Sequence, residues 1–205
     1  MSAASIPAFT LRPFDPADAA PLLEIYAPIV HRTAISFESE PPDAAGFARR
    51  LTEIQRSHCC WTGSDAQGPA GYAYAARFRE RDAYRWSVET SVYVHARTRR
   101  RGLASALMQR VLDDCLQQGR RLALAGIVLP RGTERSHLGD AQPDPYLPGN
   151  NRASVELHER LGFRFVGRFE GVGWKFGRGY DVGFWQLPLG DWTSAPEPPQ
   201  PSAAR

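Results

Sequence analysis

Cysteine is scarce in this chain of 205 residues, which contains only Cys59, Cys60 and Cys115. An odd number of cysteines without the spacing of metal ligands argues against a disulfide framework and predicts reduced thiols in a cytoplasm. Long apolar runs are absent as well, since none approaches the ~20 residues of a membrane span. The first residues lack the basic start and apolar stretch of a signal peptide. We therefore expect a cytoplasmic protein without a membrane partner.

Excess charge of one sign is also small, because 25 Lys and Arg face 22 Asp and Glu, which leaves a net charge of +3. Proteins dedicated to nucleic acids carry more concentrated positive charge, so we expect no nucleic-acid partner. The one short basic run, 97–101, has few aromatic neighbours, and a nucleic-acid-binding module is the weaker alternative. The five histidines are scattered without ligand spacing, so no metal is expected.

Hydrophobic residues make up 42% of the chain, enough to build the core of one domain. We expect that domain over residues 1–189, and a tail, 190–205, whose composition predicts disorder. Periodicity predicts helices over 15–30, 41–56, 102–118 and 151–161. Apolar runs between turn signals predict strands over 9–12, 59–63, 71–78, 85–95, 122–129, 163–169 and 181–187. This order, with one strand–helix–strand crossover, predicts an α/β fold with helices around a mixed sheet.

The most informative segment is 92–105, where an apolar strand leads through arginines and a glycine turn into the strongest predicted helix. The first N–H groups of a helix have no intrahelical partner, and the helix dipole places partial positive charge there. Gly102 allows close backbone approach, and Arg99, Arg100 and Arg101 add positive charge. This segment predicts a phosphate-binding corner; a solvated basic surface is the alternative.

The spacing Arg99-x-x-Gly102-x-Ala104 resembles the acyl-CoA diphosphate loop of the GNAT acetyltransferases. Residues 84–94, 151–163 and 173–186 resemble segments of the phosphinothricin and methionine sulfoximine acetyltransferase branch of that family, in the same order. The resemblance implies the GNAT fold, a mixed and mostly antiparallel central sheet flanked by helices. It further implies acetyl-CoA as co-substrate, acetyl transfer to the free amine of a small amino-acid-like acceptor, and a homodimer.

The resemblance also implies roles for individual residues. Glu89 matches the acidic residue that this branch uses as base, and partial burial among apolar neighbours raises the pKa of such a carboxylate. His158 stands where many GNAT proteins carry a tyrosine that protonates the leaving thiolate; a purely structural histidine is the alternative. The implied coenzyme contacts are Val92, Tyr93, Val94, Arg99, Arg100, Arg101, Gly102, Leu103, Ala104, Ser105 and Asn151. The implied acceptor contacts are Phe37, Asp82, Ala83, Tyr84, Thr90 and Ser91.

Two departures from the branch bear on the acceptor. Phe176 stands where phosphinothricin-specific members carry a histidine, which favours acceptors of the sulfoximine or sulfone type. Residues 130–149 form an insertion with four prolines, three glycines and no periodicity, and a lid, a dimer contact and a mobile surface loop are all open. Two further functions are alternatives: acetylation of a peptide or protein N-terminus, and binding of the coenzyme without catalysis.

Overall fold

The protein is described from a computed structural model that covers residues 9–133, 142–193 and 196–201. Within them the helices are α1 (Ala19–Arg32), α2 (Ala44–Ser57), α3 (Leu103–Gln117) and α4 (Arg152–Arg160). The strands are β1 (Thr10–Pro13), β2 (Cys59–Asp65), β3 (Gly68–Arg77), β4 (Ser87–Val94), β5 (Leu122–Pro130), β6 (Arg164–Lys175) and β7 (Arg178–Pro188). None of the helices in this described part is long and apolar enough to cross a membrane.

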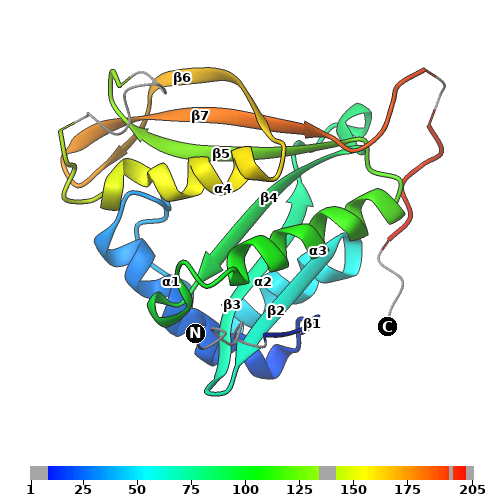
Figure 1. Cartoon of the computed structure of the whole chain (residues 1–205), viewed down its shortest axis with the longest axis horizontal. Helices are drawn as coiled ribbons and strands as arrows, with labels where there is room; N and C mark the ends of the chain where they lie inside the picture. The colour runs from blue at the N-terminus through cyan, green and yellow to red at the C-terminus, as the bar shows by residue number, and fades with distance from the viewer. Residues whose placement is uncertain (1–8, 134–141, 194–195, 202–205) are drawn as a thin grey trace, which may run out of the picture.

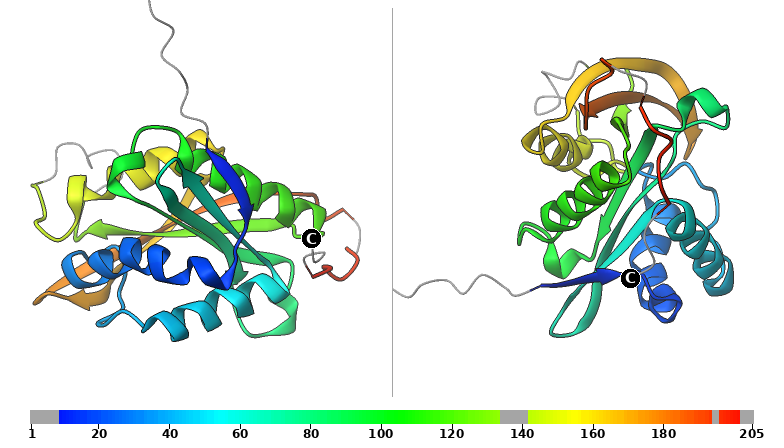
Figure 2. Two further views of the ribbon diagram at one scale, coloured as in Figure 1. Left: turned by 90° about the horizontal axis from the view of Figure 1, so that it is seen from below. Right: turned by 90° about the vertical axis from the view of Figure 1, so that its right-hand side faces the viewer.

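All seven strands join one sheet in the order β1-β2-β3-β4-β5-β7-β6. Neighbours are antiparallel except β4 and β5, which are parallel and are connected through α3. The sheet therefore confirms the predicted mixed and mostly antiparallel α/β architecture. Helices α1 and α2 cover one face, whereas α3 and α4 lie on the other (Figures 1 and 2).

Each helix buries the face that its apolar spacing predicts. On α3, Leu103, Leu107 and Val111 follow one another at intervals of four residues and are fully buried against the sheet. On the opposite side, Leu22 of α1 and Phe47 of α2 pack in a second core. Successive strand residues alternate between these two cores, so each strand side chain is assigned to one face of the sheet.

The parallel strands β4 and β5 separate soon after they begin. Their register runs only from Ser87 opposite Leu122 to Glu89 opposite Leu124. Beyond Glu89, β4 pairs with β3 alone, and β5 pairs with β7 alone. Figure 1 shows β4 and β5 diverging, with the beginning of α3 near the end of β4. The divergence leaves two strand edges without a sheet partner in the middle of the fold.

The last two strands are longer than predicted. The sequence patterns predict strands over 163–169 and 181–187, whereas the hairpin runs from Arg164 to Pro188 with its turn at Phe176 and Gly177. The prediction is wrong here because β6 contains two register shifts, which interrupt the alternation of apolar and polar residues.

The insertion and the tail are each described in part. Residues 134–141 of the insertion, including His137, and residues 194–195 and 202–205 of the tail lie outside the described residues. The described end of the insertion contributes Leu147, which is fully buried. The described tail residues contact the domain although their composition predicts no structure: Trp86 donates to the Glu197 carbonyl at 2.9 Å, and the Gln200 N–H donates to the Gln118 carbonyl at 3.0 Å.

Candidate active site

The arginine–glycine corner, residues 97–102, joins β4 to α3. Hydrogen bonds attach it to the β2–β3 hairpin. Arg97 donates to Asp65 at 2.9 Å, and the Thr98 hydroxyl donates to the Ala70 carbonyl at 3.3 Å. Arg100 and Gly102 then adopt left-handed backbone conformations, with φ of 58° and 89°. Arg97 is therefore a structural residue, and the chain turns sharply just before the helix.

The corner presents its backbone donors to open space. The first hydrogen bond of α3 runs from the Ala106 N–H to the Gly102 carbonyl at 3.0 Å. The preceding N–H groups, Leu103 to Ser105, therefore have no acceptor within the helix. A Cβ at Gly102 would meet nothing within 4 Å. Unpaired donors, the helix dipole and the arginines together give this corner the chemistry that suits an anion.

The free edge of β4 leads from this corner toward Glu89. Val92, Tyr93 and Val94 pair with β3 on one side, and their other edge faces the opening toward β5. Their side chains only pack: Val92 and Val94 contact the α3 core, and Tyr93 contacts the core beneath α1 and α2. The backbone of this segment is free to accept an extended ligand as an added strand.

Asn151 reaches the facing strand. Its side chain makes no capping bond to α4, and its φ is 61°. A 3₁₀ turn, Pro148–Asn151, already leads into the helix, and the Asn151 amide donates instead to the Val128 carbonyl of β5 at 3.1 Å. The residue holds the start of α4 against the free edge of β5.

Glu89 is the last β4 residue paired with β5, and its carboxylate lies at the point where the strands part. A Cβ at Gly126 of β5 would lie 3.1 Å from its Oε1, so the glycine leaves room for the carboxylate. Burial raises the pKa of Glu89, and nearby Arg79 offsets only part of that shift. Among the described residues no group donates a hydrogen bond to it. A carboxylate of raised pKa with free oxygens is suited to accept a proton.

The residues beside Glu89 divide between the two faces. Ser91 shares its face of the sheet, whereas Thr90 points to the α3 face, is buried and donates to the Leu124 carbonyl at 3.1 Å. Thr90, an expected acceptor contact, therefore lies on the face opposite Glu89 and bridges the two strands where they separate. The reason is the twofold alternation of side chains along a strand.

His158 of α4 is buried, and only one of its ring nitrogens has a partner. Nδ1 lies 2.8 Å from the Ser154 carbonyl, which can only accept, so Nδ1 carries the proton. Nε2 is buried without a hydrogen-bond partner in the described part of the chain. Burial lowers the pKa of His158, with an opposing effect from the Ser154 bond. The neutral ring therefore offers an unshared electron pair at Nε2 and has no proton there to donate.

Phe37 covers the distant end of the face on which Glu89 lies. A Cβ at Gly173 of β6 would overlap its ring, so the ring lies directly over that glycine. Its ring centroid lies 6.3 Å from that of Tyr180 on β7. Side chains of Val182 and Phe184, also on β7, approach Gly126 beside the Glu89 carboxylate. An apolar floor therefore extends from Glu89 to Phe37.

Residues 11–183 match the family model described as an acetyltransferase (GNAT) domain. The chain belongs to the GNAT acetyltransferase family. It is 32% identical to the phosphinothricin N-acetyltransferase of Streptomyces viridochromogenes, over 93% of this chain and 91% of that enzyme. It is also 32% identical to the L-methionine sulfoximine/L-methionine sulfone acetyltransferase of Salmonella typhimurium, over 92% and 98% of the two chains.

A solved structure shows the same architecture. The phosphinothricin acetyltransferase of Sinorhizobium meliloti in complex with AcCoA superposes on this chain with a TM-score of 0.78 and 32% identity, covering 92% of this chain and 93% of that one. The expected GNAT fold and family are thereby confirmed for this GNAT protein.

One charged residue near the candidate base was missed by the sequence analysis. Arg79 lies in the loop between β3 and β4, and its charge offsets part of the rise that burial causes in the pKa of Glu89. The expected acceptor contact Tyr84 is exposed and packs edge-on against Phe78. In the same loop, the Asp82 carboxylate lies 3.8 Å from the guanidinium of Arg77, the last residue of β3. Ala83 is exposed between Asp82 and Tyr84. Four arginines between 77 and 85 were the available signal, but only a structure shows which of them acts electrostatically on the carboxylate.

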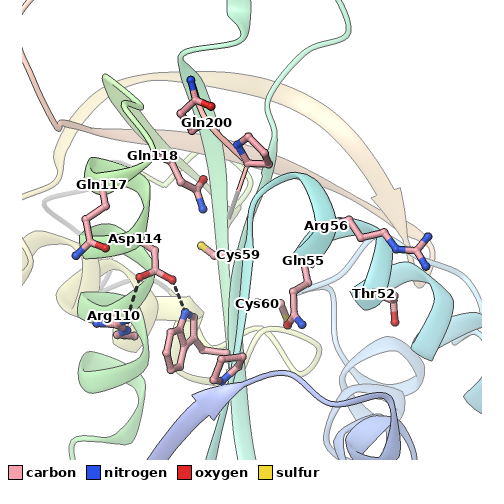
Figure 3. Close-up of a pocket in the computed structure, with 13 residues that line it drawn as sticks. Thr52, Gln55, Arg56, Cys59, Cys60, Arg110, Asp114, Gln117, Gln118 and Gln200 are labelled. Atoms are coloured by element: carbon pink, nitrogen blue, oxygen red, sulfur yellow. Dashed lines mark hydrogen bonds and ion pairs between the residues drawn. The ribbon is translucent and has the colours of Figure 1, made fainter. Parts of the chain in front are cut away.

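A cavity of about 520 Å³ lies elsewhere in this GNAT domain (Figure 3). It is lined by the last turns of α2 and α3, by the beginning of β2 and by two tail residues. Asp114 at its wall pairs with Arg110 at 3.2 Å and accepts from the Trp61 indole at 2.8 Å. The cavity is at the end of α3 opposite Gly102, so it is separate from the candidate active site.

Proposed function

We propose that this GNAT protein transfers the acetyl group of acetyl-CoA to the free amine of a small amino-acid-like acceptor. The observation that carries the proposal is the position of Glu89, a partly buried carboxylate with free oxygens, where β4 leaves β5. An amine that is protonated in water must lose a proton before it can attack a thioester, and Glu89 accepts that proton. The acetyltransferases of similar sequence support an amino-acid-like acceptor.

The coenzyme is proposed to bind along the opening. The N–H groups of Leu103, Ala104 and Ser105, with Arg99, Arg100 and Arg101, receive its diphosphate. The free edge at Val92, Tyr93 and Val94 receives its pantetheine arm, and a backbone N–H there polarises the thioester carbonyl. Asn151 borders the same opening from the β5 side.

The acceptor is proposed to lie over the apolar floor between Glu89 and Phe37. Arg79 of the neighbouring loop is proposed to pair with the α-carboxylate of an amino acid, because its charge acts on Glu89. Ser91 borders the amine from the same face of the sheet. The turn Asp82–Tyr84 bounds the entrance from the neighbouring loop.

His158 is proposed to carry a proton to the departing sulfur. After the amine nitrogen bonds to the acetyl carbon, that nitrogen is positively charged and must lose another proton as the carbon–sulfur bond breaks. The unprotonated Nε2 can receive this proton and then deliver it to the thiolate. The hydrogen bond from Nδ1 to Ser154 keeps the ring in the tautomer that this relay requires.

Replacement of His158 by phenylalanine tests the relay. The edge-to-face packing against Phe163 is kept and Nε2 is removed, so we expect kcat to fall about 10²-fold, with little change in the KM of acetyl-CoA. Steady-state kinetics measures both constants. A kcat within about threefold of the unsubstituted enzyme would make His158 a structural residue of the α4 core.

An acceptor panel tests the proposed function itself. Release of free thiol from acetyl-CoA is measured with methionine sulfone, methionine sulfoximine, phosphinothricin, unmodified amino acids and a short peptide with a free N-terminus. We expect turnover of the small amino-acid analogues and little turnover of the peptide. Turnover of the peptide alone supports the peptide acetyltransferase, and coenzyme binding without thiol release supports a protein that has lost catalysis.

A homodimer is proposed along the edge strand β6. This outermost strand of the sheet carries five exposed large apolar side chains. They are Phe165, Val166, Phe169, Val172 and Trp174. Such a concentration on an edge strand is typical of a surface covered by another protein chain. The cytoplasm is proposed as the compartment, because all three cysteines are buried free thiols.

Substitution of one residue in this patch tests the dimer. We expect the chain to sediment at twice its mass of 22.8 kDa, and Val172→Asp to sediment as a monomer, because a charge would be buried without a partner. Leu116→Asp, at an equally exposed apolar position on α3, is the matched control and should remain dimeric. A monomeric unsubstituted chain at micromolar concentration would contradict the proposal.

A further inference from the structure

The described end of the insertion is attached to two other loops that lie near the acceptor surface. The Ala34 N–H, just after α1, donates to the Tyr146 carbonyl at 2.7 Å. The Tyr146 ring stacks on Phe176 in the β6–β7 turn, with centroids 4.4 Å apart and planes at 20°. Leu147 is buried in a common core with Ala34 and Tyr180. The segment around Tyr146 is thus part of the packed structure.

The β6–β7 turn holds an aromatic residue in an unfavourable backbone conformation. Phe176 has a φ of 51°, a region that bulky side chains rarely adopt and that needs support from neighbouring contacts. Tyr146 covers its ring, and the Lys175 ammonium lies 5.0 Å from the ring centroid. The same ammonium donates to the carbonyls of Val30 and Ser36, each at 2.7 Å. The turn is therefore bound to the loop that follows α1.

That loop carries Phe37, the residue at the far end of the apolar floor. Phe37 follows Ser36 directly and lies over Gly173, so the position of its ring depends on the contacts made by Lys175. Both carbonyls accept from the Lys175 ammonium, so two of its three N–H donors hold the cation against α1 and the loop that follows it. The side chains at this end of the acceptor surface, Phe37 and Tyr180, are aromatic, so they offer an acceptor side chain mainly apolar contact.

We propose that Tyr146 is a positioning residue for acceptor selectivity: by stacking on Phe176 it holds the β6–β7 turn and, through Lys175, keeps Phe37 over the acceptor surface. With the Phe37 ring held in this position, the apolar surface favours acceptors with a neutral side chain over acceptors with an anionic one. This inference rests on the proposed function. It gives the insertion a specific role, since Tyr146 belongs to the inserted residues.

The test compares two acceptors in Tyr146→Ala and in the unsubstituted enzyme. The kcat/KM for methionine sulfone, which is neutral, is divided by that for phosphinothricin, which is anionic. We expect this ratio to fall by about tenfold or more in Tyr146→Ala, mainly through a higher KM for the sulfone, with the KM of acetyl-CoA unchanged. Tyr146→Phe keeps the ring and should keep the ratio within about twofold.

A second substitution reaches the same contact from the other side and does not depend on the stability of Tyr146→Ala. Phe176→Gly removes the stacked ring and relieves the left-handed conformation, so the variant should fold and should lower the ratio to a similar extent. The double variant should fall no further than either single variant, because both remove one contact. The control is Trp192→Ala, a substitution in the tail that removes an edge-to-face aromatic contact with Trp86. This variant should keep the ratio.

The outcomes separate the two proposals. If the unsubstituted enzyme acetylates these amino acids and the ratio is unchanged in both Tyr146→Ala and Phe176→Gly, the inference is overturned and the proposed function stands. If the unsubstituted enzyme acetylates no amino acid, the proposed function is overturned and the inference with it. A lowered ratio in both variants, with Tyr146→Phe unaffected, supports the positioning role.

Discussion

Glu89→Gln is expected to lower kcat/KM for the acceptor at pH 7 by about 10²- to 10⁴-fold, the range typical of a lost general base. Glutamine has nearly the same shape, so it still fits beside Gly126, but its amide cannot accept the proton of the ammonium. Binding of acetyl-CoA, measured by calorimetry, should be unchanged, because the corner at Gly102 belongs to a different part of the fold.

The pH dependence of the two enzymes should differ in a defined direction. Glu89 must be ionised to act, and burial raises its pKa, so activity is lost as pH falls through that raised value. In Glu89→Gln the inflection at the pKa of Glu89 should disappear. The remaining activity should instead rise with pH until the acceptor amine has lost its proton in solution. Glu53→Gln, on the exposed side of α2, is the control. If Glu89→Gln stays within about threefold of the unsubstituted enzyme at every pH, Glu89 is not the base.

A matched pair of substitutions at Gly102 is expected to show that the corner binds the diphosphate. Asparagine and aspartate have the same size, and both tolerate positive φ at a cost of about 1 kcal/mol. Gly102→Asp also places a negative charge where the phosphates are proposed to lie. Two unit charges 4 Å apart near a protein surface interact by about 4 kcal/mol. We therefore expect the KM of acetyl-CoA to rise several-fold in Gly102→Asn and by about 10²-fold or more in Gly102→Asp.

Two controls separate this effect from unfolding. An aspartate at the start of a helix is favourable to the helix itself, so Gly102→Asp should melt at or above the temperature of Gly102→Asn. S-acetyl-pantetheine, which lacks the diphosphate, should be used equally well by both variants. A similar rise in the acetyl-CoA KM for Asn and Asp would mean that the backbone conformation matters at this corner and the charge of the ligand does not.

The features that the sequence predicted well depend on residues close together in the chain. The corner between β4 and α3 requires only a strand, a glycine and a helix in succession, and the α3 core face follows from its spacing of four residues. The longer β6–β7 hairpin was missed because its register shifts break the local alternation. The hydrogen bond from the Asn151 amide to Val128, a partner 23 residues away, was not foreseen because no local pattern reveals it.

By itself, the sequence determined the order of the elements, the GNAT family and the candidate base, since each of these is written in short continuous segments. Only the tertiary structure decided where β4 and β5 separate, which face Thr90 occupies and which arginine acts electrostatically on Glu89. It also decided that Tyr146 packs on Phe176. The physical reason is that strand pairing, burial and electrostatic contact join residues distant in the chain, whereas periodicity and capping act only over neighbouring turns.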